Sequence, residues 1–369
     1  MTQSTSHAPK HSAPEVRSGA DTVPSTGIWR DKFGLRLWVR LVIAALVVVA
    51  TISLSGGLNS HDTYLYGTLA AWALIASSLN LVVGYAGQLN LSSGAFLALG
   101  AYIGVLGTGR YDWPGWKSLL IAGLIALAFS LLLGLVIFRA RGLHFALITA
   151  GISIIGYNVA LLWKEKTGGA AGISSAGPIE EGGIARPFVL GPIELSQEVH
   201  YLRAMVVVLV VMLLATSVLV RRKLGLSWQA TRDDEVLAAS VGVRVARSKR
   251  TAFAASSVLI SLVGVLYGHW LGFITPGSFD FATAAFEPLA MVIIGGAGTL
   301  LGPMVGALVV VGFPELFNGL KDYSTLVYAA LLLLVVMVAP KGVVGVVEST
   351  WRRVRRGKRP SEQEKETER

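Results

Sequence analysis

The sequence contains no cysteine. This absence excludes disulfide frameworks, thiolate metal sites, iron–sulfur clusters and cysteine nucleophiles. Charged residues are also scarce, at 15% of the chain, whereas a soluble domain carries roughly 25%. Hydrophobic residues make up 53% of the 369 positions. Because a soluble globule cannot hide that much apolar surface, the composition predicts an integral membrane protein.

Long apolar runs divide most of the chain. A helix that crosses the hydrocarbon core needs about 20 mostly apolar residues. Candidate segments lie at 38–55, 65–83, 94–107, 118–138, 143–163, 201–220, 251–273, 286–296, 302–317 and 324–339. Three of them (94–107, 286–296 and 302–317) are short, which predicts discontinuous or tilted pieces against protein or a cavity. We therefore expect an all-α membrane protein with about ten transmembrane segments, some of them discontinuous.

The basic residues are unevenly distributed along these segments. With ten crossings, both tails, the turn at Arg139–Arg141 and the loop 221–250 fall on one side, which carries 25 basic and 11 acidic residues. The other side carries 7 basic and 11 acidic residues. Since cytoplasmic loops are enriched in Lys and Arg, the pattern predicts that both termini are cytoplasmic. The net charge of +10 then needs no nucleic-acid partner.

The two tails differ from the apolar middle. Residues 1–36 begin with a Ser-, Thr- and Pro-rich stretch without the apolar core of a signal peptide, which predicts a disordered cytoplasmic tail. Residues 341–369 mix basic and acidic residues and predict a solvated cytoplasmic tail attracted to anionic membrane lipid. The transmembrane domain is therefore expected at 37–340, with 221–250 as its main cytoplasmic loop.

The segment 84–94, GYAGQLNLSSG, interrupts two apolar runs. Its glycines weaken helix formation, and its polar side chains include Gln88, Asn90 and Ser92. Unwound backbone at membrane depth survives only against protein or a water-filled path, and such breaks are the best pointer to a transport site. The alternative is an ordinary cytoplasmic hairpin loop, against which stands the lack of any Lys or Arg.

A second glycine-rich break occupies 295–303, GGAGTLLGP. Pro303 is suited to the first turn of a new helix, where its missing N–H is not needed. Two such breaks in separated parts of the chain hint at an internal repeat. A role of Gly295, Gly296 and Gly298 in close helix packing is nearly as strong an interpretation.

The loop 221–250 holds 8 basic and 3 acidic residues. The acids Asp233, Asp234 and Glu235 precede a short Val-Leu-Ala-Ala stretch that ends near Gly242, and this order matches helix start and stop signals. The loop therefore predicts a short cytoplasmic helix. Its role is either topological, to hold the loop inside, or the docking of a cytosolic motor.

Few ionisable residues lie in or near the spans. His144, His269, Glu287 and Glu315 stand at span ends, where they are expected to be interface residues rather than members of a proton relay. No paired acids or His-x-x-His spacing occurs within a span, so a metal site and intramembrane hydrolysis have no support. No G-x-x-x-x-G-K-[ST] motif occurs, so the chain is expected to hold no nucleotide and no cofactor of its own.

Several motifs together resemble one family. They are GYAGQLNLSSGAFLALGAY (84–102), RARGLHFALIT (139–149), TGGAAGI (167–173), ATRDDEVLAASVGVRVARSKRTAFAASS (230–257) and GGAGTLLGP (295–303). In this order they resemble the permease subunits of ABC importers for branched-chain amino acids, of the LivM type. The resemblance covers most of 65–317 and leaves out the tails.

The resemblance implies partners and roles. It implies a second, homologous permease, two cytosolic ATPase subunits that hold ATP and Mg, an extracytoplasmic solute-binding protein, and a place in the inner membrane of a prokaryote. It implies that the loop 230–250 is the coupling loop of the ATPase, and that both breaks line the substrate path. The coupling residues would be Arg232, Asp233, Asp234, Glu235, Ala238, Ala239 and Gly242. The pathway residues would be Tyr85, Gln88, Asn90, Ser92, Gly295, Gly296 and Gly298.

Alternatives remain for the solute and for the energy source. Family members often carry S-L-G-H where this chain has Leu91-Ser92-Ser93-Gly94. This departure leaves urea, short amides and aromatic acids open as solutes besides branched-chain amino acids. An ion-coupled secondary transporter is a further alternative, but it would call for acids or histidines deep within the spans, which the sequence lacks.

Overall fold

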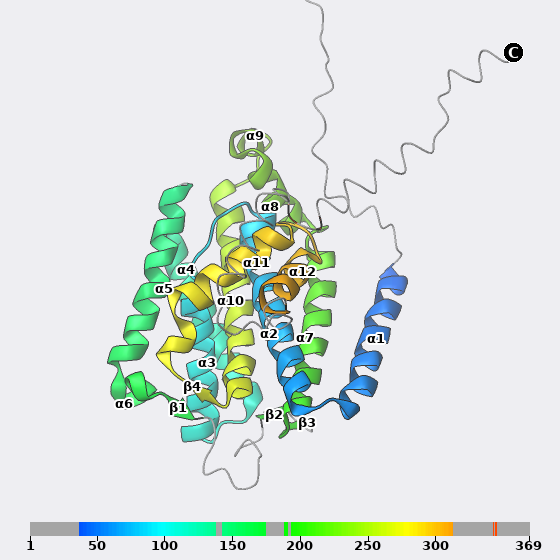
Figure 1. Cartoon of the computed structure of the whole chain (residues 1–369). Coiled ribbons are helices and arrows are strands. Elements are labelled where there is room, and N and C mark those ends of the chain that lie inside the picture. Colours follow the sequence, from blue (N-terminus) through cyan, green and yellow to red (C-terminus); the bar gives the residue numbers. More distant parts are fainter. Residues whose placement is uncertain are drawn as a thin grey trace, which may run out of the picture. The chain divides into compact units, whose positions relative to one another are not determined.

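The computed structural model describes residues 37–137, 142–174, 188–190, 193–312, 342 and 344, all within one compact unit, Leu35–Arg369. Figure 1 shows these residues as a bundle of helices. The long helices are α1 Leu37–Leu54, α2 Ser60–Asn80, α3 Ser93–Arg110, α4 Gly115–Ile137, α5 Leu143–Leu162, α7 Glu198–Leu219 and α10 Val245–Leu271. The shorter ones are α6 Lys164–Thr167, α8 Lys223–Asp233, α9 Glu235–Ser240, α11 Glu287–Gly295 and α12 Gly302–Ala307.

Six segments of the described residues are long and apolar enough to cross a membrane. They are Ser60–Tyr85, Gly115–Leu135, Leu143–Leu162, Glu198–Leu219, Val245–Leu271 and Pro276–Gly295. They confirm a multi-pass helical membrane protein. Helices α1 and α3, of 18 residues each, coincide with two more predicted runs. The run 324–339, the N-terminal tail 1–36 and nearly all of the C-terminal tail lie outside the described residues.

Helices α2 and α10 form the centre of the bundle. In the most apolar window of each helix, 89% of α2 and 72% of α10 is buried. Close packing of α10 against α3 depends on small residues, because a Cβ on Gly100 would collide with the backbone of Ser261 and one on Gly264 with Leu97. Helix α2 contacts both helices that flank the second break, and α10 contacts the π turn of the first break.

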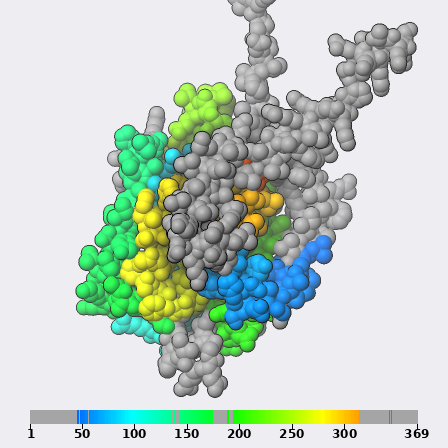
Figure 2. Space-filling model, in the orientation of Figure 1, coloured from blue at the N-terminus to red at the C-terminus, as the bar shows by residue number. Residues whose placement is uncertain are grey.

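Helices α4 and α5 form the apolar exterior. Only 28% of the most apolar window of each is buried, and Leu132 and Ile155 expose 61% and 63% of their surface. Figure 2 shows α5 in green along one margin of the molecule. Exposed apolar surface of this extent would promote aggregation in water, but it is the expected surface of helices that face lipid.

The run 286–296 follows an irregular stretch, the run 302–317 is described only as far as Gly312, and the run 94–107 lies in a continuous helix. The segment before the second break consists of a 3₁₀ turn at Pro276–Phe279, a π turn at Ala282–Phe286 and α11. Helix α12 passes into a π turn at Leu308–Gly312. The run 94–107 lies within α3, which extends to Arg110 as a continuous helix, so the prediction that this run is discontinuous is wrong, while a tilt stays a prediction.

The described residues also include four short strands, so the all-α prediction needs a correction. Strand β1 (Ile173–Ser174) pairs antiparallel with β4 (Phe273–Ile274), and β2 (Phe188–Leu190) pairs with β3 (Ile193–Leu195). The strand pairs provide hydrogen-bond partners for backbone N–H and C=O groups in connections that are not helical. In Figure 1 they lie at the end of the bundle opposite to α8 and α9.

Candidate functional site at the junction of two helix breaks

The first break is a true interruption between α2 and α3. Helix α2 passes into a π turn at Leu81–Tyr85, the chain is non-helical from 86 to 92, and α3 begins at Ser93. Gly87 has φ of +70°, a conformation that glycine adopts without the clash of a Cβ. The glycines and polar residues thus end one helix and start another within the bundle.

Helix α5 holds the unwound segment through hydrogen bonds. The N–H of Leu91 donates to Thr149 Oγ1 at 3.1 Å, and the carbonyl of Leu91 accepts from Ser153 Oγ at 2.7 Å. Within the segment, Asn90 Oδ1 accepts from the N–H and the hydroxyl of Ser92, at 3.0 and 2.7 Å. The break is therefore an ordered structure rather than a loose hairpin.

Buried amide groups remain in this segment. Gln88 is 8% exposed and Asn90 is fully buried. Among the described residues, both amide atoms of Gln88 and the Nδ2 of Asn90 have no hydrogen-bond partner. A buried polar group without a partner costs about 1–3 kcal/mol, so these atoms are the most favourable contacts for a polar ligand near the break. Tyr85, three residues before Gln88 in the sequence, is also buried, with 5% of its surface exposed.

The second break lies between α11 and α12. Gly296 and Gly298 have φ of +121° and +80°, and the hydroxyl of Thr299 donates to the carbonyl of Gly296 at 2.8 Å. Pro303 stands in the first turn of α12, as its sequence position predicts. Gly295 has a packing role as well, since a Cβ there would lie 2.8 Å from the backbone nitrogen of Gly306.

Asn80 joins the two breaks. Its Oδ1 accepts from the N–H of Gly298 and its Nδ2 donates to the carbonyl of Thr299, each at 2.8 Å. The pair of bonds fixes the orientation of the amide, because one neighbour is a donor and the other an acceptor. A Cβ on Gly84 would meet both Asn80 Oδ1 and the nitrogen of Gly298. Two glycine-rich segments from distant parts of the sequence are therefore in direct contact.

Arg232, at the end of α8, reaches the same junction. Its guanidinium donates through Nη1 to the carbonyl of Gly84. A Cβ on Gly87 would lie 2.8 Å from the Cγ of Arg232, and a Cβ on Gly298 would collide with the Nη1 of Arg232. The carbonyls at the end of a helix lack partners and carry partial negative charge, which a guanidinium neutralises. A residue of the predicted coupling loop thus contacts both predicted breaks.

Burial changes the acid–base properties of this arginine. Desolvation lowers the pKa of Arg232, and the neighbouring Asp233 and Tyr85 oppose that shift. Arg remains protonated in proteins because its ordinary pKa is above 12. The guanidinium is therefore a permanent cation at the junction.

The predicted short helix of the cytoplasmic loop is α9, and its cap is Asp234. The Asp234 carboxylate accepts from the N–H groups of Val236 and Leu237 at 2.8 and 3.0 Å, which is the geometry of an N-cap. Gly242 has φ of +87° just beyond the helix. The sequence missed α8, which precedes α9 and carries Arg232 and Asp233.

The predicted coupling residues divide into two sets. Arg232 and Ala238 turn inward, and Glu235 pairs with Lys249 at 2.5 Å. The exposed members are Asp233, Asp234, Ala239 and Gly242. Sequence reasoning noted the Val-Leu-Ala-Ala stretch but missed that its apolar side chains are exposed: Val236 and Leu237 in α9 are 81% and 64% exposed, and Val241 just beyond it is 73% exposed.

The remaining candidates lie elsewhere. His269 lies in the last turn of α10, at the span end where it is expected, and its side chain is fully buried in the protein: Nδ1 donates to the carbonyl of Val265 at 2.7 Å, and Nε2 lies 2.8 Å from Thr108 Oγ1. His144 is exposed and Glu287 is half-buried, whereas Glu315 lies outside the described residues. The part of the chain that the structure describes holds no cluster of three His, Asp or Glu residues that could bind a metal ion.

Comparison with known proteins identifies the family. Residues 63–339 match the family described as the branched-chain amino acid transport system / permease component. The chain belongs to this family. It is 34% identical over 321 residues to the high-affinity branched-chain amino acid transport system permease protein LivM of Escherichia coli K12, which covers 83% of this chain and 75% of that protein. LivM of Salmonella typhimurium is 33% identical over 74% of this chain and 67% of its own length.

A second type of permease is also related. LivH of Escherichia coli K12, a permease protein of the transport system with the same name, is 27% identical over 75% of this chain and 92% of its own length. No solved structure matches the chain. The family confirms the predicted resemblance and identifies the chain as a transport permease component of the membrane. Both breaks and the loop that carries α8 and α9 lie within the matched residues.

Proposed function

We propose that the chain is one permease of an ATP-driven importer that moves branched-chain amino acids into the cytoplasm. A second permease, two cytosolic ATPases and an extracytoplasmic solute-binding protein complete the importer. The names of the LivM and LivH relatives support this solute and a pair of permeases. The distribution of basic residues supports an orientation with both termini and the α8–α9 end in the cytoplasm.

The contact of Arg232 with both breaks carries the mechanism. The exposed acids Asp233 and Asp234 and the exposed apolar residues of α9 face a cytosolic partner, and α8 connects α9 to the junction through Arg232. When the ATPases close and open, they displace α9, and α8 transmits the displacement. Because Arg232 bonds the carbonyl of Gly84 and touches Gly298, withdrawal of Arg232 releases both breaks at once.

The described conformation has a closed junction. The glycines of both breaks are in backbone contact with their neighbours, with no room for a Cβ at Gly84 or Gly298. Opening requires Arg232 to leave the carbonyl of Gly84. A zwitterionic solute would then meet a helix N-terminus at Ser93 for its carboxylate and a free carbonyl for its ammonium group, with the amides of Gln88 and Asn90 beside it. The chain itself performs no covalent chemistry.

Reconstitution tests this function. Proteoliposomes that contain the permease pair, the ATPases, and the binding protein on the appropriate side should accumulate radiolabelled leucine only when ATP is present on the cytoplasmic side. Leucine moved by the permease pair alone, down a proton or sodium gradient and without ATPase, would favour an ion-coupled transporter and refute the proposal. Uptake of urea or benzoate in place of leucine would overturn the solute but retain the mechanism.

A further inference from the structure

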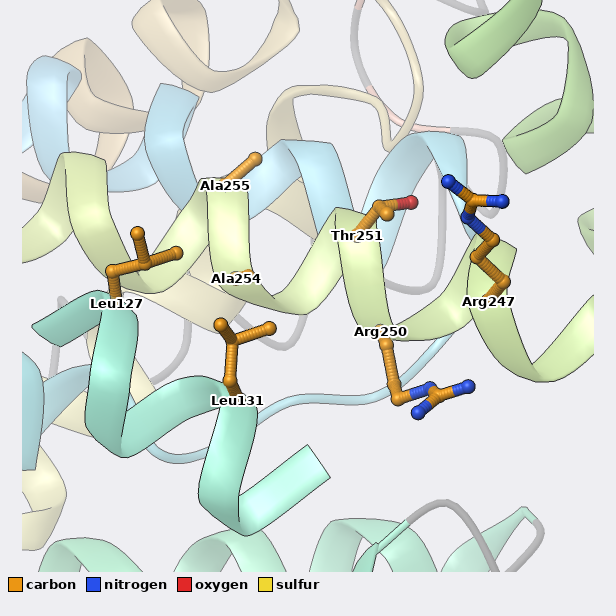
Figure 3. A pocket seen from close by; sticks show the side chains of 7 residues that line it. All are labelled: Leu127, Leu131, Arg247, Arg250, Thr251, Ala254 and Ala255. Carbon is orange, nitrogen blue, oxygen red and sulfur yellow. The ribbon is translucent and has the colours of Figure 1, made fainter. Parts of the chain in front are cut away.

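A groove between α4 and α10 lies apart from the junction. Its cavity has a volume of about 480 Å³, within the range of roughly 300–1,000 Å³ of sites that bind small molecules. Figure 3 shows Leu127 and Leu131 on α4 beneath the first turns of α10, which carry Arg247 and Arg250. The lining residues are Leu127, Leu131, Arg247, Arg250, Thr251, Ala254 and Ala255.

The two arginines have no acidic partner among the described residues. Arg250 Nε donates to the carbonyl of Ala246 at 3.2 Å, and neither guanidinium has a carboxylate within ion-pair distance in the described part of the chain. Lys249, between them in sequence, is paired with Glu235 instead. The groove itself is lined by no acid. Two cations in a partly apolar setting therefore favour an anionic occupant.

The rest of the groove is apolar and belongs to the lipid-facing exterior. Leu127 and Leu131 are 39% and 48% exposed, and most of α4 is exposed in the same way. A soluble anion would contact the arginines but leave the leucines bare. An apolar helix of a partner would cover the leucines but leave two cations without counter-charges. An occupant with an anionic head and an aliphatic tail satisfies both halves.

We propose that this groove binds an anionic phospholipid of the inner leaflet. Its phosphate lies at the end of the groove that carries Arg247 and Arg250, and one acyl chain follows Leu127 and Leu131. The proposal rests on the orientation given under the proposed function, which places the start of α10 at the cytoplasmic headgroups. Basic pockets between transmembrane helices on that side are suited to anionic headgroups.

The groove has a connection to the coupling segment. Thr251, one of its lining residues, accepts a 3.0 Å hydrogen bond from the indole N–H of Trp228. Trp228 is buried in α8, the helix that carries Arg232. A lipid in the groove would therefore contact the same residue of α10 that α8 contacts.

Lipid retention by the purified complex tests the proposal. The complex is equilibrated in mixed micelles with dioleoyl phosphatidylglycerol or dioleoyl phosphatidylcholine, and retained lipid is counted by native mass spectrometry. Each basic residue near an anionic surface contributes about fivefold in affinity, so Arg247→Gln with Arg250→Gln should weaken phosphatidylglycerol retention by about thirtyfold. Arg244→Gln, an exposed residue just before α10 that does not line the groove, should leave retention unchanged.

Two kinds of result would overturn the proposal. One is retention without selectivity: either the wild-type complex retains both lipids equally, or the double variant loses no more phosphatidylglycerol than Arg244→Gln does. The other is disulfide or bismaleimide cross-linking of a single Leu131→Cys to a partner subunit, which would show that protein covers the groove. Retention does not depend on transport, so leucine uptake that fails while retention is selective would refute the proposed function and leave the lipid site intact.

Discussion

Asn80 accepts a hydrogen bond of 2.8 Å from the backbone N–H of Gly298, which lies 218 positions later in the chain. The same amide donates to the carbonyl of Thr299. The side chain of Asn80, the last residue of α2, thereby fixes the second break against the first. Arg232 adds a contact from the cytoplasmic loop, so three segments far apart in sequence meet at one place.

Replacement of Asn80 by alanine should destabilise the junction. The change leaves the N–H of Gly298 and the carbonyl of Thr299 unpaired and buried, at about 1–3 kcal/mol for each group. We expect a thermal unfolding midpoint several degrees lower in nanodiscs, measured by intrinsic fluorescence. Asn158→Ala is the matched control, because Asn158 is exposed and donates only to Ile154 of its own helix. Equal midpoints for the two variants would show that Asn80 does not hold the breaks together.

Gly84→Ala should disrupt the contact between the breaks. Its Cβ would meet Asn80 Oδ1 and the nitrogen of Gly298, which cannot move without a shift of the second break. Gly151→Ala is the control, since a Cβ there meets nothing within 4 Å and alanine favours the helix by about 0.5–1 kcal/mol. We expect poor recovery of folded Gly84→Ala by size-exclusion chromatography and normal recovery of Gly151→Ala. Full recovery of both would contradict the observed packing.

Charge reversal on α9 should weaken ATPase docking. Asp234→Lys with Glu235→Lys removes two of the three acids of the loop and the N-cap of α9. Co-purification of the ATPases and ATP hydrolysis in the complex should therefore fall, while membrane insertion is retained. Asp234→Asn separates the two effects, since asparagine preserves the cap but carries no charge. Docking through charge predicts weaker association for Asp234→Asn also. Undiminished hydrolysis in the assembled charge-reversal complex would remove α9 from the docking surface.

Gln88→Leu should impair uptake and leave assembly intact, because neither amide atom of Gln88 has a hydrogen-bond partner among the described residues. If this amide contacts the solute, its loss removes a hydrogen bond to a charged ligand worth about 1.5–3 kcal/mol, which corresponds to at least about tenfold in uptake rate at low leucine concentration. Asn90 is left unchanged because its Oδ1 holds Ser92. Leu89→Ala, an exposed neighbour, is the control. Normal uptake kinetics in Gln88→Leu would exclude this amide from the solute path.

The sequence predicted both breaks and the short cytoplasmic helix because their signals are local. Glycines and amides within apolar runs are conspicuous, and Asp234 and Gly242 are capping residues at the expected places. The sequence did not predict that the breaks touch, because Asn80 is one polar residue among many apolar ones and its partners are distant in the chain.

Helix α8 and the role of Arg232 also escaped sequence analysis. In the stretch KLGLSWQATRD the apolar residues alternate with polar or small ones, a period of two that is typical of a strand rather than a helix. The contacts of Arg232 depend on tertiary packing against Gly84 and Gly87. The strands were missed because two or three residues are too few for an alternating pattern to be recognised. Contacts set by packing, rather than local preferences, define the junction.

The ratio of leucine molecules imported to ATP molecules hydrolysed tests the central claim most directly. The ratio is measured in proteoliposomes for Arg232→Gln and for Arg222→Gln, an exposed arginine just before α8. If Arg232 links the coupling segment to both breaks, Arg232→Gln should keep hydrolysing ATP while its ratio falls at least tenfold, and Arg222→Gln should match the wild type. A wild-type ratio in Arg232→Gln would contradict the account.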